Sequence, residues 1–328
     1  MSPAAARAEL IEDRGAAAAS DQFFRCRPFL DAEGVTHTLR IESDAGELLA
    51  PLIVRPIGEG PELDAISPYG YPGISRSGRT SSRYAEGSTT STGGIDPGAV
   101  DFSATGLVSA FIRHTLEEPP PLAGSGERNV VQIADPELPP KRRSSDRNQI
   151  NKNRRNGYET RIVPGPESGP AERAGFLEAY EQTMRRAGAG ERYFFGAPYF
   201  ERILESPATW LALALAPDGT VAAASIAARS DGFLHYYLSG SADSHLRDSP
   251  MKNVVAALVE HAAALALPLN LGGGLSRGDP LEEFKRGFAN REQSWRTSEL
   301  VCDPAAYARL SAGHDAGSFF PAYRAPRG

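Results

Sequence analysis

The sequence predicts an α+β protein in which strands and helices occur in two successive groups. Three observations support this class. Segments with alternating apolar residues are separated by turn signals, helical spacing recurs between them, and the order of elements partly repeats after a Pro-Pro-Lys-Arg-Arg segment at residues 139–143. With 328 residues, of which 41% are hydrophobic and 23% charged, the chain can bury a sizeable core and accommodate two domains.

The first half is expected to comprise residues 21–140, after a flexible tail at residues 1–20. Residues 36–57 alternate as strands do on both sides of an Asp-Ala-Gly turn, which predicts a β-hairpin. A further strand is expected at residues 62–66, where the alternation ends in a loop rich in Pro, Gly and Tyr. A Ser/Gly/Thr-rich stretch up to Gly94 has the composition of a loop.

Two more elements are expected in this half. Residues 101–118 place Phe102, Leu107 and Phe111 among apolar side chains at roughly helical spacing, which predicts an amphipathic helix. Residues 128–134 predict a short strand, and the prolines that follow it mark a boundary because proline cannot donate to a strand ladder. The last segment of the chain, residues 296–328, is expected to return to this half.

The second half is expected to span residues 141–295. Ser249 and Pro250 are expected to begin one of its helices, with Ser249 as the cap, and Asp279 to cap the last one. In order, the expected elements are a basic helix at 143–156, a strand at 160–163, helices at 171–188 and 198–206, three strands within 208–241, the helix after Ser249, a strand at 267–274 and a short helix at 279–288.

Composition and motifs disfavour several classes of protein. The longest apolar run, at residues 210–216, is far shorter than the ~20 residues of a membrane helix, so we expect no transmembrane segment. Cys26 and Cys302 form no CxxC pair, and the N-terminal residues lack the apolar core of a signal peptide, which favours a cytoplasmic location. The six histidines lack metal-binding spacing, and we expect neither a metal nor a cofactor.

Positive charge is concentrated at residues 141–161, although the whole chain has a net charge of −6. Eight basic residues lie there with only two acids, Asp146 and Glu159. A nucleic-acid backbone is a natural partner for such a stretch, because neutralised phosphates release counterions. A solvated helix face is the alternative interpretation. The candidate RNA-binding residues are Arg143, Arg147, Lys152, Arg154 and Arg155.

Five segments resemble known protein families. They are residues 67–73, the basic helix at 147–159, the segment 180–189, His-Tyr-Tyr-Leu-Ser-Gly-Ser at 235–241, and the block 269–288 with its glycine triplet and Phe-Lys pair. The order of elements in the second half resembles N-acyltransferases of the GNAT superfamily. The two halves together resemble the Fem family of aminoacyl-tRNA-dependent peptidyltransferases. The resemblance implies two GNAT-like halves with mixed sheets flanked by helices.

The resemblance implies catalytic roles for the Phe-Lys pair. Lys285 is expected to place its ammonium group near the developing oxyanion or the tRNA 3′ phosphate. Phe284 is expected to stack or pack near the terminal adenosine. The alternatives are a core position for Phe284 and a solvated charge for Lys285. Asp64, just before the 67–73 loop, is the candidate general base, and a substrate phosphate or carbonyl is the alternative proton acceptor.

Candidate residues for acceptor binding lie in both halves. Arg185 and Arg186 suit bidentate binding of a diphosphate, which acceptors of the Fem family often carry. A basic helix end that faces its own dipole is the alternative. The tyrosine candidates are Tyr69 and Tyr71 in the first half, and Tyr236 and Tyr237 on opposite faces of one strand.

The segment at residues 246–253 distinguishes two possible donors. Relatives that use acetyl-CoA hold its pyrophosphate on consecutive N–H groups of a Gly-rich loop at this place. Here Asp248 would repel phosphate, Pro250 has no N–H group, and no glycine allows close approach. The segment therefore favours aminoacyl-tRNA as the donor, and a helix start without functional meaning is the alternative.

The sequence thus predicts an acyltransferase that moves an aminoacyl group from aminoacyl-tRNA to an amine and forms a peptide bond. The expected acceptor is a peptidoglycan precursor or a peptide-type intermediate of natural-product (antibiotic) biosynthesis, with peripheral contact to the inner membrane if the acceptor is lipid-linked. An acyl-CoA-dependent N-acyltransferase is the alternative enzyme. A tRNA- or wall-precursor-binding protein is the alternative without catalysis.

Overall fold

The computed structural model describes residues 6–15, 18, 21–44, 46–76, 94–116, 120–274, 276–315, 317 and 319–325. The Ser/Gly/Thr-rich stretch before Gly94 lies outside these residues, as do parts of the expected tail. The chain divides into two compact units, which are unit 1 (residues 1–19, 33–128 and 295–328) and unit 2 (residues 20–32 and 129–294). Among the described helices, none has the length and hydropathy needed to cross a membrane.

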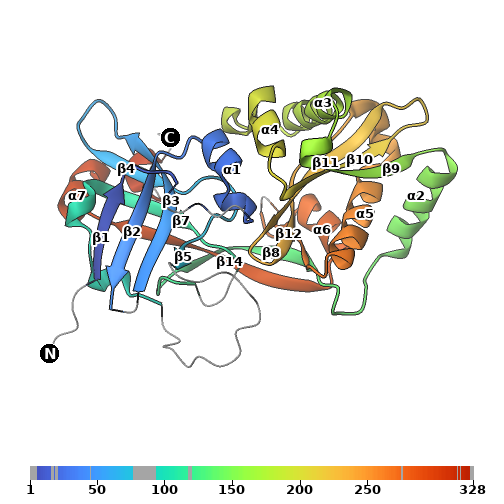
Figure 1. The fold of residues 1–328 in the computed structure, drawn as a ribbon. Helices are drawn as coiled ribbons and strands as arrows, with labels where there is room; N and C mark the ends of the chain where they lie inside the picture. Colours follow the sequence, from blue (N-terminus) through green and yellow to red (C-terminus); the bar gives the residue numbers. More distant parts are fainter. Residues whose placement is uncertain are drawn as a thin grey trace. The chain divides into compact units, whose positions relative to one another are not determined.

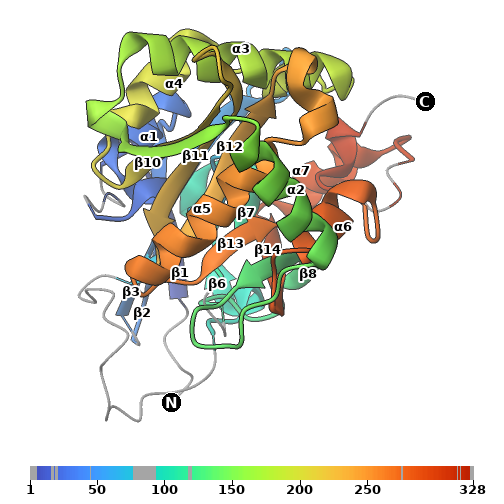
Figure 2. The ribbon, with the colours of Figure 1, turned by 90° about the vertical axis from the view of Figure 1, so that its right-hand side faces the viewer.

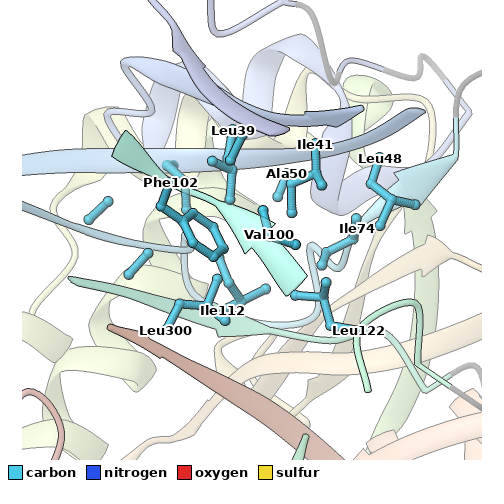
Figure 3. Packing of buried hydrophobic residues seen from close by; sticks show 14 of the residues in the cluster. Leu39, Ile41, Leu48, Ala50, Ile74, Val100, Phe102, Ile112, Leu122 and Leu300 are labelled. Atoms are coloured by element: carbon cyan, nitrogen blue, oxygen red, sulfur yellow. The ribbon is translucent and has the colours of Figure 1, made fainter. Parts of the chain in front are cut away.

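Unit 1 is built around a sheet in the order β6-β1-β2-β3-β4-β7-β14, and β1, β2 and β3 lie side by side (Figure 1). Its strands are β1 (Ala6–Ile11), β2 (His37–Ser43), β3 (Gly46–Pro56), β4 (Leu63–Ile66), β5 (Ser75–Arg76) beside β3, β6 (Val100–Asp101), β7 (Leu107–Arg113) and the later part of β14 (Arg291–Val301), with α7 (Pro304–Ser311) after them. Figure 3 shows Leu39 and Ile41 of β2 in a buried apolar cluster with Phe102 and Ile112. This cluster is the core of unit 1.

Two expectations for unit 1 are wrong. The predicted tail contains β1, which pairs with β2 and whose Ala6 and Ala8 are buried. The sequence analysis misses this strand because alternating alanines give only a weak strand signal. The helix predicted at residues 101–118 is mainly strand β7, after a turn that Gly106 ends with a φ of 66°. Since β7 lies between β4 and β14 and is buried on both faces, its apolar run shows no alternation. The hairpin predicted at residues 36–57 is confirmed.

Unit 2 contains a sheet in the order β8-β13-β12-β11-β10-β9, in which only β12 and β13 are parallel neighbours. Helices α3 and α4 cover one face of this sheet and α5 the other, with α2 beside α5 (Figure 2). The elements are α1 (Arg27–Ala32), β8 (Gly126–Ala134), α2 (Ser144–Arg155), β9 (Glu159–Pro164), α3 (Pro170–Arg186), α4 (Ala197–Leu204), β10 (Thr209–Leu215), β11 (Val221–Ser230), β12 (Phe233–Ser241), α5 (Met251–Ala264), β13 (Leu269–Gly272) and α6 (Pro280–Arg286).

The predicted fold class is confirmed, with mixed sheets and flanking helices. Residues 21–32, which the sequence analysis assigns to the first half, belong to unit 2. Arg25 there is buried and forms an ion pair with Asp231, and the ring centroid of Phe24 lies 5.4 Å from that of Tyr237. In unit 1, residues Thr297 to Val301 of β14 pair with β7.

Gly240 allows α3 to approach β12 closely. A Cβ atom at this position would lie 2.4 Å from backbone atoms of Ala179 and Tyr180. Gly240→Ala is therefore expected to lower the free energy of unfolding by about 1–3 kcal/mol, because helix backbone cannot yield as a side chain can. Urea denaturation would measure the change, with Gly190→Ala as the control because a Cβ there meets nothing within 4 Å. Equal midpoints for the two variants would contradict this account.

Candidate functional site

Helix α2 has one buried face and one cationic face. Asp146, Ile150 and Asn153 are buried and stand four and three residues apart, which places them on the same side of the helix. The opposite faces carry four exposed basic residues, none of which forms an ion pair with another described residue: Arg147, Lys152, Arg154 and Arg155. The fifth RNA-binding candidate, Arg143, is ion-paired with Glu283 of α6. The basic side chains of α2 thus face solvent, and the opposite side of the helix is buried against the protein.

The anchor is a hydrogen-bond network between α2 and the start of α5. The Nδ2 atom of the fully buried Asn153 donates to the Asp248 carbonyl at 2.8 Å and to Oδ1 of Asn253 at 2.8 Å. Gln149 donates to the same carbonyl at 3.0 Å. Nearby, Nζ of Lys252 lies 2.9 Å from Oδ1 of Asp146. Side chains of α2 therefore fix the turn that leads into α5.

That turn offers little to a phosphate group. The amide N–H groups of Ser249, Lys252 and Asn253 donate to backbone carbonyls of residues 246, 249 and 250 at 2.9–3.1 Å. Pro250 has no N–H group, and the Asp248 carboxylate accepts a hydrogen bond from the Tyr158 hydroxyl at 2.9 Å. Negative charge and engaged amides are the opposite of a diphosphate cradle.

The predicted cap of this helix is wrong. Ser249 adopts a left-handed conformation with a φ of 48°, and Pro250 precedes the first helical residue, Met251, without a side-chain cap. The Ser249 hydroxyl lies 3.5 Å from the Leu246 carbonyl. The short 3₁₀ segment Asp243–Asp248 ends directly before Ser249, so the chain turns sharply there and the hydroxyl faces back along it.

Helix α6 holds Lys285 beneath the glycine segment that follows β13. Asp279 caps this helix by accepting from the Glu282 amide at 2.7 Å, as the sequence predicts. The Lys285 side chain is buried, and its Nζ donates to the Gly273 carbonyl at 2.7 Å. Burial lowers the pKa of Lys285 to about 8, an effect that the Asp279 carboxylate partly opposes. The Lys285 amine is thus held in a fixed position and can lose its charge near pH 8. A solvated surface lysine has neither property.

Phe284 packs against the main apolar cluster of unit 2, with its ring centroid 5.7 Å from that of Phe288. This position agrees with the core alternative, and a role beside a terminal adenosine stays a prediction. Tyr236 also packs on this cluster, where burial raises its pKa to about 12. Tyr237 instead contacts the rings of Phe23 and Phe24, and its hydroxyl lies 2.8 Å from that of Tyr199.

In unit 2, Arg185 pairs with Glu181 one turn earlier on α3, and Arg186 pairs with Asp243, so both candidate diphosphate ligands have acidic neighbours. Their role in acceptor binding stays a prediction.

Three candidates belong to unit 1. Asp64 is fully buried and forms ion pairs with Arg55 at 2.9 Å and Arg324 at 2.5 Å. The rings of Tyr71 and Trp295 form a T-shaped pair with centroids 5.4 Å apart, and the Tyr69 amide donates to Glu33 at 2.8 Å. The oxygens of Asp64 are therefore already engaged by two guanidinium groups, and its role as a general base stays a prediction.

Sequence reasoning missed the residues that join α2 to α5. Gln149, Asn153 and Asn253 were not among the candidates, although the spacing of Asp146, Ile150 and Asn153 marks an inward face in a helix that is otherwise cationic. Within the described part of the chain, no cluster of three or more His, Cys, Asp or Glu side chains is arranged to hold a metal ion.

Comparisons with known proteins agree with this fold. Residues 140–286 match the model of an acetyltransferase (GNAT) domain. The crystal structure of FemX aligns with a TM-score of 0.59 at 11% identity and covers 87% of this chain and 93% of its own. L-PGS from Bacillus licheniformis aligns with a TM-score of 0.51 at 13% identity, over 81% of this chain and 84% of that one. The C-terminal domain of a putative lysylphosphatidylglycerol synthetase from Agrobacterium fabrum aligns with a TM-score of 0.53 at 13% identity, over 88% and 89%.

None of the curated proteins matches the sequence. The domain match gives residues 140–286 a GNAT fold. The architecture of the whole chain is Fem-like, since the similarity in fold to FemX extends over most of both chains. The family resemblance that the sequence indicates is thus confirmed at the level of the fold.

Asn153→Ala is expected to loosen α2 from α5. The variant leaves Oδ1 of Asn253 without the Asn153 donor, and the Asp248 carbonyl keeps only the hydrogen bond from Gln149. A buried polar group that is left unsatisfied costs about 1–3 kcal/mol. Urea denaturation should therefore show a lower unfolding midpoint for Asn153→Ala. Asn151→Ala, on the exposed side of the same helix, is the matched control and should change little. An unchanged midpoint in Asn153→Ala would contradict the assigned anchor.

Proposed function

We propose that this protein transfers an aminoacyl group from aminoacyl-tRNA to an amine acceptor and forms a peptide bond. One observation carries the proposal. The same helix that is hydrogen-bonded to the turn ahead of α5 presents four exposed cations without acidic partners among the described residues. The donor's phosphates would then be bound by RNA-contacting arginines on α2 and not by amides of the α5 turn. The fold similarity to FemX and to a putative lysylphosphatidylglycerol synthetase supports transfer of an aminoacyl group.

The chemistry is aminolysis of an ester. The neutral amine attacks the ester carbonyl, the tetrahedral intermediate carries negative charge on oxygen, and the ribose hydroxyl leaves as the new amide forms. Lys285 is the residue proposed to stabilise that negative charge or the 3′ phosphate, because its ammonium group is held by Gly273 in a buried position. Phe284 contributes by fixing α6 against the apolar cluster.

The acceptor is a peptidoglycan precursor or a peptide-type natural-product intermediate, with Arg185 and Arg186 as anchors for its diphosphate and the tyrosine candidates beside it. A lipid-linked acceptor would bring the protein to the inner membrane surface. The GNAT domain match at residues 140–286 favours a second candidate, an N-acyltransferase that uses acyl-CoA.

One assay separates these functions. The purified protein is incubated with an amine acceptor and either charged tRNA or acetyl-CoA, with and without ribonuclease treatment of the tRNA. The proposal predicts acylated acceptor only with charged tRNA, and loss of product after ribonuclease. Product with acetyl-CoA alone would instead establish the second candidate. Binding of charged tRNA without any product would indicate a binding protein.

Charge reversal on α2 is expected to weaken the use of tRNA. Arg154→Glu combined with Arg155→Glu should raise the KM for charged tRNA at least tenfold and reduce the salt dependence of KM, because two phosphate contacts are removed. Steady-state kinetics at several salt concentrations would measure this. Arg229→Glu, which reverses an exposed arginine on β11, is the control for charge reversal outside α2 and should leave KM unchanged. Unaltered kinetics at low salt in the double variant would refute RNA binding by α2.

Lys285 is expected to make turnover depend on pH. Because burial lowers its pKa to about 8, the stabilising cation is present below pH 8 and is lost as the pH rises through that value. Wild-type kcat should therefore fall above about pH 8, whereas Lys285→Arg, which stays charged, should lack this decline. Lys285→Ala should lower kcat by about 10²–10³-fold at pH 7 while circular dichroism shows a folded protein. Wild-type turnover in Lys285→Ala would refute the assignment.

A further inference from the structure

Unit 2 contains a cavity that shares only Arg147 with the candidate residues of the site described above. It has a volume of about 580 Å³, within the range of about 300–1,000 Å³ that suits small organic groups. The cavity opens between the loop after β8, the start of α2 and the C-terminal half of α5. Apolar side chains form much of its lining, and these include Leu138, Val259, Ala263 and Phe288. A flat apolar group such as a nucleobase would find a suitable surface there.

The loop that walls the cavity is held in place by one side chain. Nδ2 of Asn290 donates to the carbonyls of Asp135 and Pro139 at 2.9 and 3.2 Å, and its Oδ1 accepts from the Asp135 amide at 2.8 Å. The Asp135 carboxylate is 3.2 Å from Nε of Arg291, which balances its charge. Hydrogen bonds therefore fix the loop on this side of the cavity, and the negative charge of Asp135 is balanced by Arg291.

The rim of the cavity is cationic. Lys141 and Arg147 line it, are exposed, and form no ion pair with any residue that the structure describes. Arg142 also lines it and is only loosely paired, at 3.8 Å from Glu260. An apolar floor with cations at the rim is complementary to a base whose phosphate reaches the edge of the cavity.

The cationic rim continues along α2. Arg147 and Arg154 are seven residues apart, which is close to two helical turns, so they lie on one side of the helix about 10.5 Å apart along its axis. A chain of phosphates leaving the cavity would therefore meet a second arginine on the same stripe. A free mononucleotide would use only the cavity and its rim. The stripe thus favours a nucleotide that is part of a longer RNA.

We propose that this cavity binds one unstacked nucleotide of the bound RNA, with the base against Val259 and Ala263 and the phosphate at Lys141 and Arg147. Single-stranded RNA is generally recognised in this way, through bases that leave the stack and contact a protein surface. The inference deepens the proposed function, on which it rests for the identity of the RNA as tRNA. It assigns a recognition subsite to a part of unit 2 that holds none of the candidate catalytic residues.

Filling the cavity tests the proposal. Ala263→Phe adds a side chain to its lining without changing charge, and Ala264→Phe is the matched control, since the neighbouring Ala264 is exposed but does not line the cavity. The probes are a labelled RNA hairpin with a four-nucleotide single-stranded 3′ end, followed by fluorescence anisotropy, and each of the four nucleoside 5′-monophosphates as a competitor. We expect Ala263→Phe to weaken hairpin binding at least fivefold and to abolish competition by the best monophosphate, with Ala264→Phe equal to wild type.

The outcomes separate this proposal from the proposed function. Equal hairpin affinity in wild type and Ala263→Phe would overturn the nucleotide subsite, even if Arg154→Glu still weakens binding and the α2 surface is thereby retained. Equal weakening by Ala263→Phe and Ala264→Phe would also overturn it, because the effect would then be a general disturbance of α5. Loss of hairpin binding in Ala263→Phe, combined with competition by a monophosphate in wild type only, would support it. Failure of the proposed function itself would appear as transfer from acetyl-CoA in the ribonuclease assay.

Discussion

The hydrogen bonds from Asn153 to the Asp248 carbonyl and the Asn253 side chain are the interaction on which the remaining interpretation depends. They hold the basic helix α2 against the start of α5 and fix the turn that leads into α5. Two features accompany this anchor. The amides of Ser249, Lys252 and Asn253 and the Asp248 carboxylate are hydrogen-bonded within the protein, so the turn offers little to a diphosphate. The outer faces of α2 are left with cations directed to solvent, where a polyanion can reach them.

Lys285 adds a chemical group to this frame within the same unit. The carbonyl of Gly273 orients its amine, and burial lowers its pKa toward physiological pH, where the charge is easily gained or lost. Arg143 and Glu283 connect α2 to α6, so that the cationic helix and the helix of Lys285 contact each other. This contact supports the proposal that RNA binding and the stabilisation of a transition state occur in neighbouring parts of one GNAT domain.

From β8 onward the sequence was sufficient to predict the helices and strands of unit 2, because their lengths and turns are encoded locally, as is the Asp279 cap before α6. It did not predict α1, and the cap it predicts for α5 is wrong. It was insufficient where burial removes the alternation that distinguishes a strand from a helix, as in β7, or where alanines weaken it, as in β1. The candidates on α2 were visible as a charge run. Their anchor, Asn153, and the cavity beside Arg147 depend on contacts between residues far apart in the chain, which no local pattern contains.

The state of the turn before α5 decides between the two donors. Coenzyme A would be titrated into ¹⁵N-labelled protein while amide chemical shifts of residues 246–253 are recorded, with an RNA hairpin in a parallel titration. The account predicts no saturable shift in this turn with coenzyme A, and saturable shifts along α2 with the RNA. Saturable binding of coenzyme A with its largest shifts at Ser249, Met251 and Lys252 would contradict it.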